Sequence, residues 1–204
     1  MIEFYFWPTP NCRKISILLE ELQLPFALHR IDIHSGQQKL PQFLEVNPNG
    51  RVPAIVDHEP AEGGKVVLAE SGAILVYLAG KVEGWLPRKQ SDLAEVLQWL
   101  FWQMSALGPM QGQASHFLNS ASDPCTYARD RFKAEVARLY QVLEDRLATR
   151  QYLCRSFGLA DIACFPWVSL SARGGIDLSK YPSVSRWMDA LSARPAVGRG
   201  MVLT

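Results

Sequence analysis

The chain has 204 residues, of which 48% are hydrophobic, 20% charged and 10% aromatic, a composition that excludes a disordered chain and a coiled-coil rod. Its 21 basic and 20 acidic side chains leave a formal net charge of +1, too balanced for the broad positive surface that binds nucleic acid. We therefore expect a globular protein with no nucleic-acid partner.

Membrane, secretion and metal signals are all missing from the sequence. No stretch approaches the roughly 20 apolar residues that span a bilayer, and the start MIEFYFWPTP does not have the pattern of a signal peptide. The four cysteines form no close pair, which suits reduced intracellular thiols better than a disulfide framework. Neither they nor the four histidines have metal-ligand spacing. We expect a cytoplasmic protein with no membrane partner and no metal.

The first eighty residues alternate strand-like and helix-like patterns. Ile2–Trp7 is a short apolar and aromatic run that predicts a strand ended by prolines. From Ile15 to Leu22, apolar residues then recur at the i, i+3, i+4, i+7 spacing of one helix face. Five more segments follow as strand, helix, strand, strand and helix: Phe26–Ile33, Leu40–Val46, Ala54–Val56, Val66–Ala69 and Ser71 to about Lys81. The order βαβαββα predicts a small α/β domain of thioredoxin-like architecture.

Everything after about residue 90 has helical periodicity. Leu93–Met104 and Val136–Leu147 each form an apolar stripe and predict long amphipathic helices. Ala160–Val168 is apolar almost all round and predicts a buried central helix, interrupted at Pro166 because proline lacks a backbone N–H. We therefore predict a thioredoxin-like domain at 1–83, a linker at 84–90 and an all-α helical bundle at 91–204.

The segment Pro8-Thr9-Pro10-Asn11-Cys12 lies where the first strand meets the first helix. A helix start presents unpaired N–H groups and about half a positive charge, which favour an anion such as a thiolate. Thiol-disulfide enzymes of this architecture carry C-P-x-C here, whereas T-P-N-C replaces the first cysteine by threonine. Thr9 or Asn11 can instead donate a hydrogen bond to the sulfur of a bound thiol and lower its pKa. Alternatively, both residues only cap the helix.

Val52-Pro53 precedes a predicted strand. Only about 5–6% of X-Pro bonds in folded proteins are cis, but in a thioredoxin-like sheet a cis-proline at this place frees the backbone of the preceding residue to pair with an extended peptide. A proline that merely opens an edge strand is the other interpretation.

Glu70-Ser71 begins another predicted helix. Ser71 can offer hydroxyl and backbone donors to a carboxylate, and Glu70 can hold an ammonium group. Together they suit the amino-acid end of a γ-glutamyl ligand, although a serine at this place is more often only a helix cap.

Four motifs stand in an order that makes the chain resemble the cytosolic glutathione transferases over essentially its full length. They are F-x-P-T-P-N near the start, F-L-x-x-N-P-N-G-x-V-P-A-I-V-D at 43–57, E-S-G-A-I-L-x-Y-L-A at 70–79 and A-D-I-A-C-x-P-W at 160–167. Within that family, T-P-N and the segments Leu97–Gln103 and Ala106–Met110 are similar to the bacterial Nu class. That class is associated with glutathione-dependent disulfide reduction more than with conjugation of electrophiles.

The resemblance implies roles for the matching positions. Thr9 and Asn11 would face the sulfur of glutathione, and Val52, beside Pro53, would pair its backbone with the cysteinyl unit. The other implied glutathione contacts come from Gln38, Arg51, Glu70 and Ser71, with Arg131 reaching the ligand of a partner subunit in a homodimer. For Arg131 the competing interpretation is a solvated helix face shared with Arg129 and Lys133.

Two positions depart from the family pattern. Gly158 stands where a hydroxyl residue usually forms a reciprocal cap with Asp161, so half of that capping box is lost. Cys12 holds the second cysteine position of C-P-x-C, and we expect it to pack in the first helical turn rather than to form a mixed disulfide.

The expected function is glutathione-dependent disulfide reduction, with glutathione as cosubstrate supplying the reactive sulfur. The first alternative is a transferase that conjugates glutathione to electrophiles at the same site. The second is a glutathione-binding or interaction module that has lost catalysis.

Overall fold

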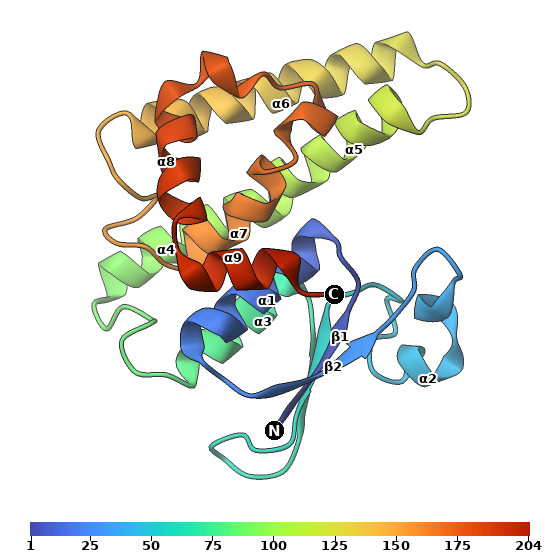
Figure 1. The fold of residues 1–204 in the computed structure, drawn as a ribbon, viewed down its shortest axis with the longest axis vertical. Helices are drawn as coiled ribbons and strands as arrows, with labels where there is room; N and C mark the ends of the chain where they lie inside the picture. Colours follow the sequence, from blue (N-terminus) through green and yellow to red (C-terminus); the bar gives the residue numbers. More distant parts are fainter. The chain divides into compact units, whose positions relative to one another are not determined.

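The computed structural model describes residues 1–204 and divides them into two units (Figure 1). The first unit comprises Met1–Leu86 together with Pro195–Thr204, and the second comprises Pro87–Arg194. The predicted ranges put residues 195–204 in the helical domain, whereas their contacts put them in the α/β unit.

The first unit is built on a four-stranded mixed sheet of order β2-β1-β3-β4. Its strands are β1 (Ile2–Phe6), β2 (Phe26–Arg30), β3 (Ala54–Asp57) and β4 (Val66–Ala69). β1 runs parallel to β2 and antiparallel to β3, which in turn runs antiparallel to β4. The element order confirms the predicted thioredoxin-like domain, with a shorter β2 and a one-turn α2 (Pro41–Leu44) where a longer strand and helix were expected.

Alternation along β1 decides which elements cover each face of this sheet. Phe4 and Phe6 are fully buried, and Arg13 of α1 (Pro10–Leu22) lies over the Phe6 ring, so α1 covers that face. Tyr5 points the other way and contacts Phe43 of α2, with 5.9 Å between ring centroids. α3 (Ser71–Gly80) packs against α1.

The C-terminal helix α9 (Pro195–Val202) lies directly on α1. The carbonyl of Gly200 accepts hydrogen bonds from Ser16 Oγ at 2.7 Å and from Arg13 Nη1 at 3.3 Å. A Cβ atom on Gly200 would lie 2.5 Å from the Cα of Ile17, a distance that no side chain tolerates. Glycine at this position therefore permits the two helix backbones to meet.

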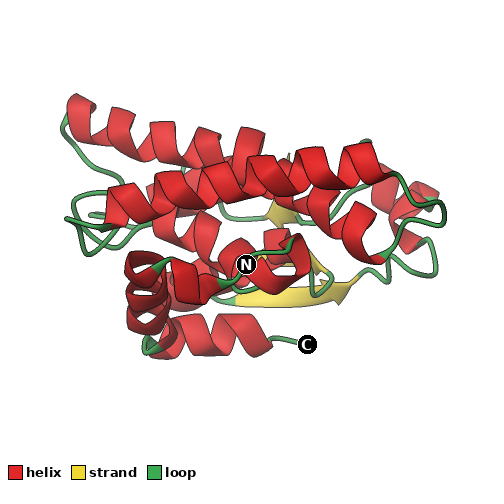
Figure 2. Cartoon of the chain, turned by 90° about the horizontal axis from the view of Figure 1, so that it is seen from above, coloured by secondary structure: helices red, strands yellow, loops and turns green.

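The second unit contains helices and loops, and all strands belong to the first unit. Figure 2 draws the strands in yellow and the helices in red. The α-helices of the second unit are α4 (Gln90–Trp102), α5 (Gly108–Asn119), α6 (Thr126–Leu147), α7 (Leu159–Val168) and α8 (Pro182–Ser192). A wider π-helical turn, Gln103–Leu107, joins α4 to α5 and ends just before Pro109, which has no N–H to give to the preceding turn. No helix in the chain is both long enough and apolar enough to cross a membrane.

The predicted interruption at Pro166 is wrong, because α7 continues through this proline to Val168. The N–H of Ser169 still reaches the carbonyl of Phe165 at 2.9 Å, so the turns on both sides of the missing donor hold the helix together. α7 is buried along nearly its whole length, and its packing offsets the loss of one hydrogen bond.

Asp161 forms its half of the capping box of α7, whereas Gly158 has no side chain to form the other half. Its carboxylate accepts the N–H of Gly158 at 3.1 Å, the N–H of Leu153 at 3.0 Å and the indole N–H of Trp187 at 2.8 Å. Burial raises the pKa of Asp161 to about 6 despite these hydrogen bonds. The side chain thus ties the loop before α7 to α8 as well as capping α7.

Candidate functional site

The strand register brings the predicted site segments to one edge of the sheet. β1, β2 and β4 run in the same direction, so the loops that follow them leave from the same edge, and β3 begins there because it runs the opposite way. Tyr5, Ala54 and Ala69 are successive partners across this edge. The turn before α1, the loop after β2, the segment before β3 and the start of α3 therefore converge.

Thr9 is the N-cap of α1. Its backbone is extended, with φ −100° and ψ 156°, and its Oγ1 accepts the N–H of Cys12 at 3.3 Å, while Pro10 takes the first helical position. The predicted capping role is therefore present, but a hydroxyl that accepts one hydrogen bond can still donate its own proton. The first turn of α1 carries no acidic side chain, so its positive end is left for an external anion. Asn11, the next predicted residue, is partly exposed in this turn.

Cys12 is fully buried beneath the same turn. Burial raises the pKa of its thiol to about 11, and a hydrogen bond with Thr9 lowers it too little to compensate. The thiol is consequently protonated and enclosed at neutral pH, which makes it a poor nucleophile. The other three cysteines belong to the second unit. This agrees with the expectation that Cys12 packs in the helix.

Val52 presents free backbone groups next to β3. The Val52-Pro53 peptide bond is cis, and the N–H and C=O of Val52 form no hydrogen bond within the chain. Pro53 is buried, whereas Val52 remains partly exposed. An extended peptide could pair with these two groups.

Asn47 organises the loop that leads to Val52, and the sequence analysis assigned it no role. It is buried, donates from Nδ2 to the carbonyl of Arg51 at 2.6 Å and accepts the N–H of Asn49 at 3.1 Å. Gly50 follows with a positive φ of 62°. The N-P-N-G motif was the available signal, because asparagine and glycine together favour such a turn.

Gln38 meets this loop from the segment after β2. Its backbone carbonyl lies 3.0 Å from the place that a Cβ of Gly50 would take. Its side-chain Nε2 donates to the carbonyl of Ile33 at 3.2 Å, and its Oε1 is buried without a partner. An unpaired buried acceptor suits a ligand that brings an N–H. Arg51 lies next to Gly50 with an exposed side chain.

Glu70 and Ser71 form the start of α3. Glu70 has a φ of 68° and a ψ of 114°, a backbone state that non-glycine residues rarely adopt, and such outliers cluster at functional sites. No side chain caps α3, and Ser71 is buried while Glu70 is exposed. The first turn of α3 can therefore receive an anion beside an exposed carboxylate.

Lys14 is a further charged residue behind this helix start, and the sequence analysis missed it. Its side chain is only 1% exposed, and its Nζ donates to Ser71 Oγ at 3.3 Å. Lys14 stands four residues before Leu18 and therefore shares the apolar stripe of α1. A lysine on a buried stripe was the signal that could have revealed it.

Arg131 belongs to the second unit, on α6. Its side chain is exposed, as are those of Arg129 and Lys133. Nothing in its own unit orders it for a ligand, so its role stays a prediction.

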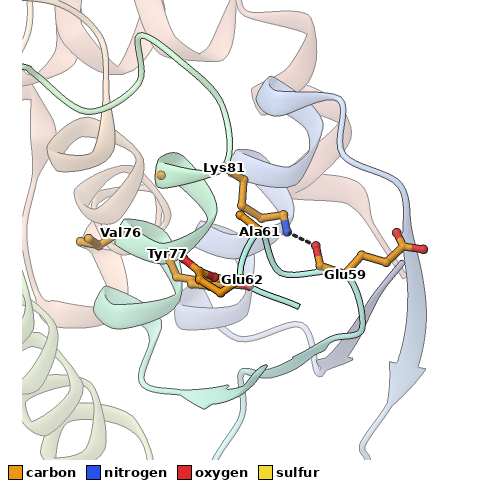
Figure 3. Close-up of a pocket in the computed structure, with 7 residues that line it drawn as sticks. Glu59, Ala61, Glu62, Val76, Tyr77 and Lys81 are labelled. Carbon is orange, nitrogen blue, oxygen red and sulfur yellow. Dashed lines mark hydrogen bonds between the residues drawn. The ribbon is translucent and has the colours of Figure 1, made fainter. Parts of the chain in front are cut away.

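A cavity of about 440 Å³ lies elsewhere on the first unit, beside α3 (Figure 3). None of the predicted site residues lines it. Lys81 on its wall donates to Asp57 Oδ2 at 2.5 Å and to the carbonyl of Glu59 at 3.0 Å. Burial raises the pKa of Asp57, but hydrogen bonds from Lys81 and Tyr77 outweigh it and hold the pKa below its usual value. This cluster ties the β3–β4 turn to α3.

No cluster of three or more histidine, cysteine, aspartate or glutamate side chains is arranged to hold a metal ion. The predicted site residues at the sheet edge offer hydroxyl, amide, carboxylate, guanidinium and backbone groups.

Comparison with known proteins links this arrangement to glutathione. Residues 9–81 match the family model of the glutathione S-transferase N-terminal domain, and residues 123–195 match that of the C-terminal domain. The chain is 46% identical over 204 residues to the disulfide-bond oxidoreductase YfcG of Escherichia coli, with 99% of this chain and 95% of that protein covered.

Two crystal structures extend the comparison. A glutathione transferase from Pseudomonas putida, with one glutathione disulfide bound per subunit, has a TM-score of 0.95 and 36% identity, covering 99% of this chain and 91% of its own. A glutathione transferase from Burkholderia graminis, with two glutathione molecules bound per subunit, has a TM-score of 0.92 and 38% identity. The match covers 98% of this chain and 87% of that one.

Proposed function

Since this chain belongs to the glutathione S-transferase family, we propose that it is a glutathione-dependent disulfide-bond oxidoreductase whose reactive sulfur comes from bound glutathione. The observation that carries the proposal is the enclosed Cys12 thiol, with its pKa raised to about 11, directly below a helix start that is open to an anion. The site is built to stabilise a thiolate, yet the chain supplies none there. The name of YfcG, a disulfide-bond oxidoreductase, supports disulfides as the substrate class.

Five groups on the first unit would hold glutathione. The free backbone of Val52 pairs with the cysteinyl unit, and the start of α3 at Ser71 receives the γ-glutamyl carboxylate, with Glu70 beside its ammonium group. Gln38 and Arg51 contact the glycyl or γ-glutamyl portions of the tripeptide. The unpaired Gln38 Oε1 and the unpaired Val52 groups support this fit, because each lacks a partner that a peptide can provide.

Thr9 stabilises the thiolate form of the glutathione sulfur. Its hydroxyl donates a hydrogen bond to the thiolate, the end of α1 adds positive charge, and both favour the ionised form. The side-chain amide of Asn11, in the same helical turn, can likewise donate a hydrogen bond to the sulfur. When bound, glutathione supplies the thiolate that attacks one sulfur of a disulfide and expels the other as a thiolate, and a second glutathione then releases the remaining thiol while glutathione disulfide forms.

Turnover assays with two acceptors test the proposal. We expect reduction of hydroxyethyl disulfide only when glutathione is present, with weaker conjugation of an aromatic halide. A large excess of halide conjugation would identify a conventional transferase instead. Calorimetric binding of glutathione without turnover of either acceptor would identify a binding module, and disulfide reduction without glutathione would contradict the borrowed sulfur.

A homodimer and a cytoplasmic location complete the proposal. Sedimentation equilibrium tests the dimer. If Arg131 completes the partner's site, Arg131→Ala raises the KM for glutathione in the dimer, whereas Arg129→Ala, at another exposed arginine of α6, does not. Equal behaviour of the two variants would leave Arg131 on a merely solvated helix face.

A further inference from the structure

Lys14 is a buried cation beside the start of α3. The proposed function assigns it no role. Its side chain is 1% exposed, and its Nζ lies 3.3 Å from Ser71 Oγ. Lysine is almost never fully buried, because removing an ammonium group from water is costly. A buried lysine therefore needs an explanation beyond the packing of α1.

The contact has a direction. An ammonium group has three donors and no acceptor, so Ser71 Oγ accepts the hydrogen bond from Lys14 Nζ. Ser71 is the first residue of α3, and no side chain caps that helix. The ammonium charge and the positive end of α3 consequently favour an anion at the same place.

We propose that Lys14 is a positioning residue that, acting through Ser71, makes the start of α3 selective for the free α-carboxylate of the γ-glutamyl residue. This inference rests on the proposed function, since it assumes that glutathione binds at the sheet edge. It adds a specificity: the site distinguishes a carboxylate from a neutral amide of the same shape. Lys14 does not touch the reacting sulfur, so its loss changes binding rather than the chemical step.

Binding of two ligands by calorimetry tests this inference. One ligand is glutathione, and the other is its analogue with the γ-glutamyl α-carboxylate converted to an amide. Wild-type protein should bind glutathione about tenfold or more tighter than the amide, as expected for a charge pair at low effective dielectric. In Lys14→Met and Lys14→Gln, glutathione should lose about that factor while the amide keeps its Kd. The KM for glutathione should rise with little change in kcat at saturation.

Lys65→Met is the matched control, because it removes one positive charge from an exposed lysine of the same unit. It should leave both Kd values unchanged. Equal weakening of both ligands in the Lys14 variants would show a purely structural lysine and overturn the inference. Should neither variant fold by circular dichroism, the wild-type preference decides, and equal binding of the two ligands overturns it. Failure of wild-type protein to bind glutathione would instead refute the proposed function itself.

Discussion

The hydroxyl oxygen of Thr9 accepts the backbone N–H of Cys12 at 3.3 Å and thereby caps α1, at the helix start where we propose that the ligand sulfur binds. The cap uses a lone pair of the hydroxyl oxygen as acceptor, and the hydroxyl proton can still be donated in a second hydrogen bond. Capping and polarisation of a thiolate, which the sequence offered as alternatives, are therefore compatible in one side chain.

Thr9→Ala tests the donor proton. Losing one hydrogen bond to a charged sulfur, worth about 1.5–3 kcal/mol, should lower kcat/KM for disulfide reduction about tenfold or more. The thiol pKa of bound glutathione, followed by thiolate absorbance, should rise. Loss of the cap should also cost about 1 kcal/mol of stability. Thr9→Ser keeps the hydroxyl and should retain both properties, and an unchanged thiol pKa in Thr9→Ala would assign the sulfur to another group.

Cys12→Ser tests whether the protein thiol takes part. Because Cys12 is enclosed and its pKa is raised to about 11, its replacement should leave glutathione-dependent turnover near the wild-type value. The free energy of unfolding should fall by about 1–3 kcal/mol, since a smaller and more polar side chain replaces a fully buried thiol. A variant that folds and binds glutathione but reduces no disulfide would make Cys12 the nucleophile.

Local patterns were sufficient to predict the element order of the N-terminal part of the first unit, but not that residues 195–204 belong to it. Strand alternation, prolines and an apolar helix stripe lie within a few residues of each other, and they fix the element order. That order then determines the site, because in this topology the ends of β1, β2 and β4 share one edge with the start of β3. Thr9, Val52 and Ser71 lie in segments that meet at this edge, although each was predicted from its own local motif and from the family resemblance.

Features that depend on distant contacts escaped the sequence analysis. Gly200 meets Ile17 across more than 180 positions, and nothing near residue 200 indicates that its helix belongs with α1. Lys14 stands out in the sequence only as a lysine on an apolar stripe, and its contact with Ser71, 57 positions away, is seen only in the structure. Pro166 is a helix breaker by local rules, and only the burial of α7 explains why the helix continues.

Gly200→Ala tests the contact between α9 and α1. The added Cβ would lie 2.5 Å from Ile17 Cα and 2.6 Å from Ile17 N, and backbone atoms cannot move aside as a flexible side chain can. We expect a loss of about 1–3 kcal/mol, typical of overpacking, and faster hydrogen exchange along α9. Gly198→Ala on the same helix has open space and should be neutral or stabilise by up to about 1 kcal/mol through helix propensity. Equal melting temperatures for the two variants would disprove close packing.

Glu144 supplies a cap from one helix to another and predicts a pH dependence of stability. Its carboxylate on α6 accepts the N–H groups of Ser183 and Val184, each at 3.0 Å, in the first turn of α8. Partial burial raises the pKa of Glu144, but these hydrogen bonds outweigh burial and hold the pKa below its usual value. A depressed pKa means that the unfolded chain takes up the proton first as the pH falls.

The stabilisation by Glu144 is therefore complete above the unfolded pKa, about 4.3, and is lost as the pH falls through the lower folded pKa. Glu144→Gln keeps the shape but removes the charge, and should cost about 1 kcal/mol at neutral pH, as for other charges at a helix N-terminus. Urea unfolding of both proteins across the acid range should show the difference shrinking as Glu144 becomes protonated. Glu135→Gln, which removes an exposed pair with Arg138 on the same helix, should cost little at any pH. A Glu144→Gln deficit that stays constant down to the acid limit would mean that the carboxylate charge does not stabilise α8.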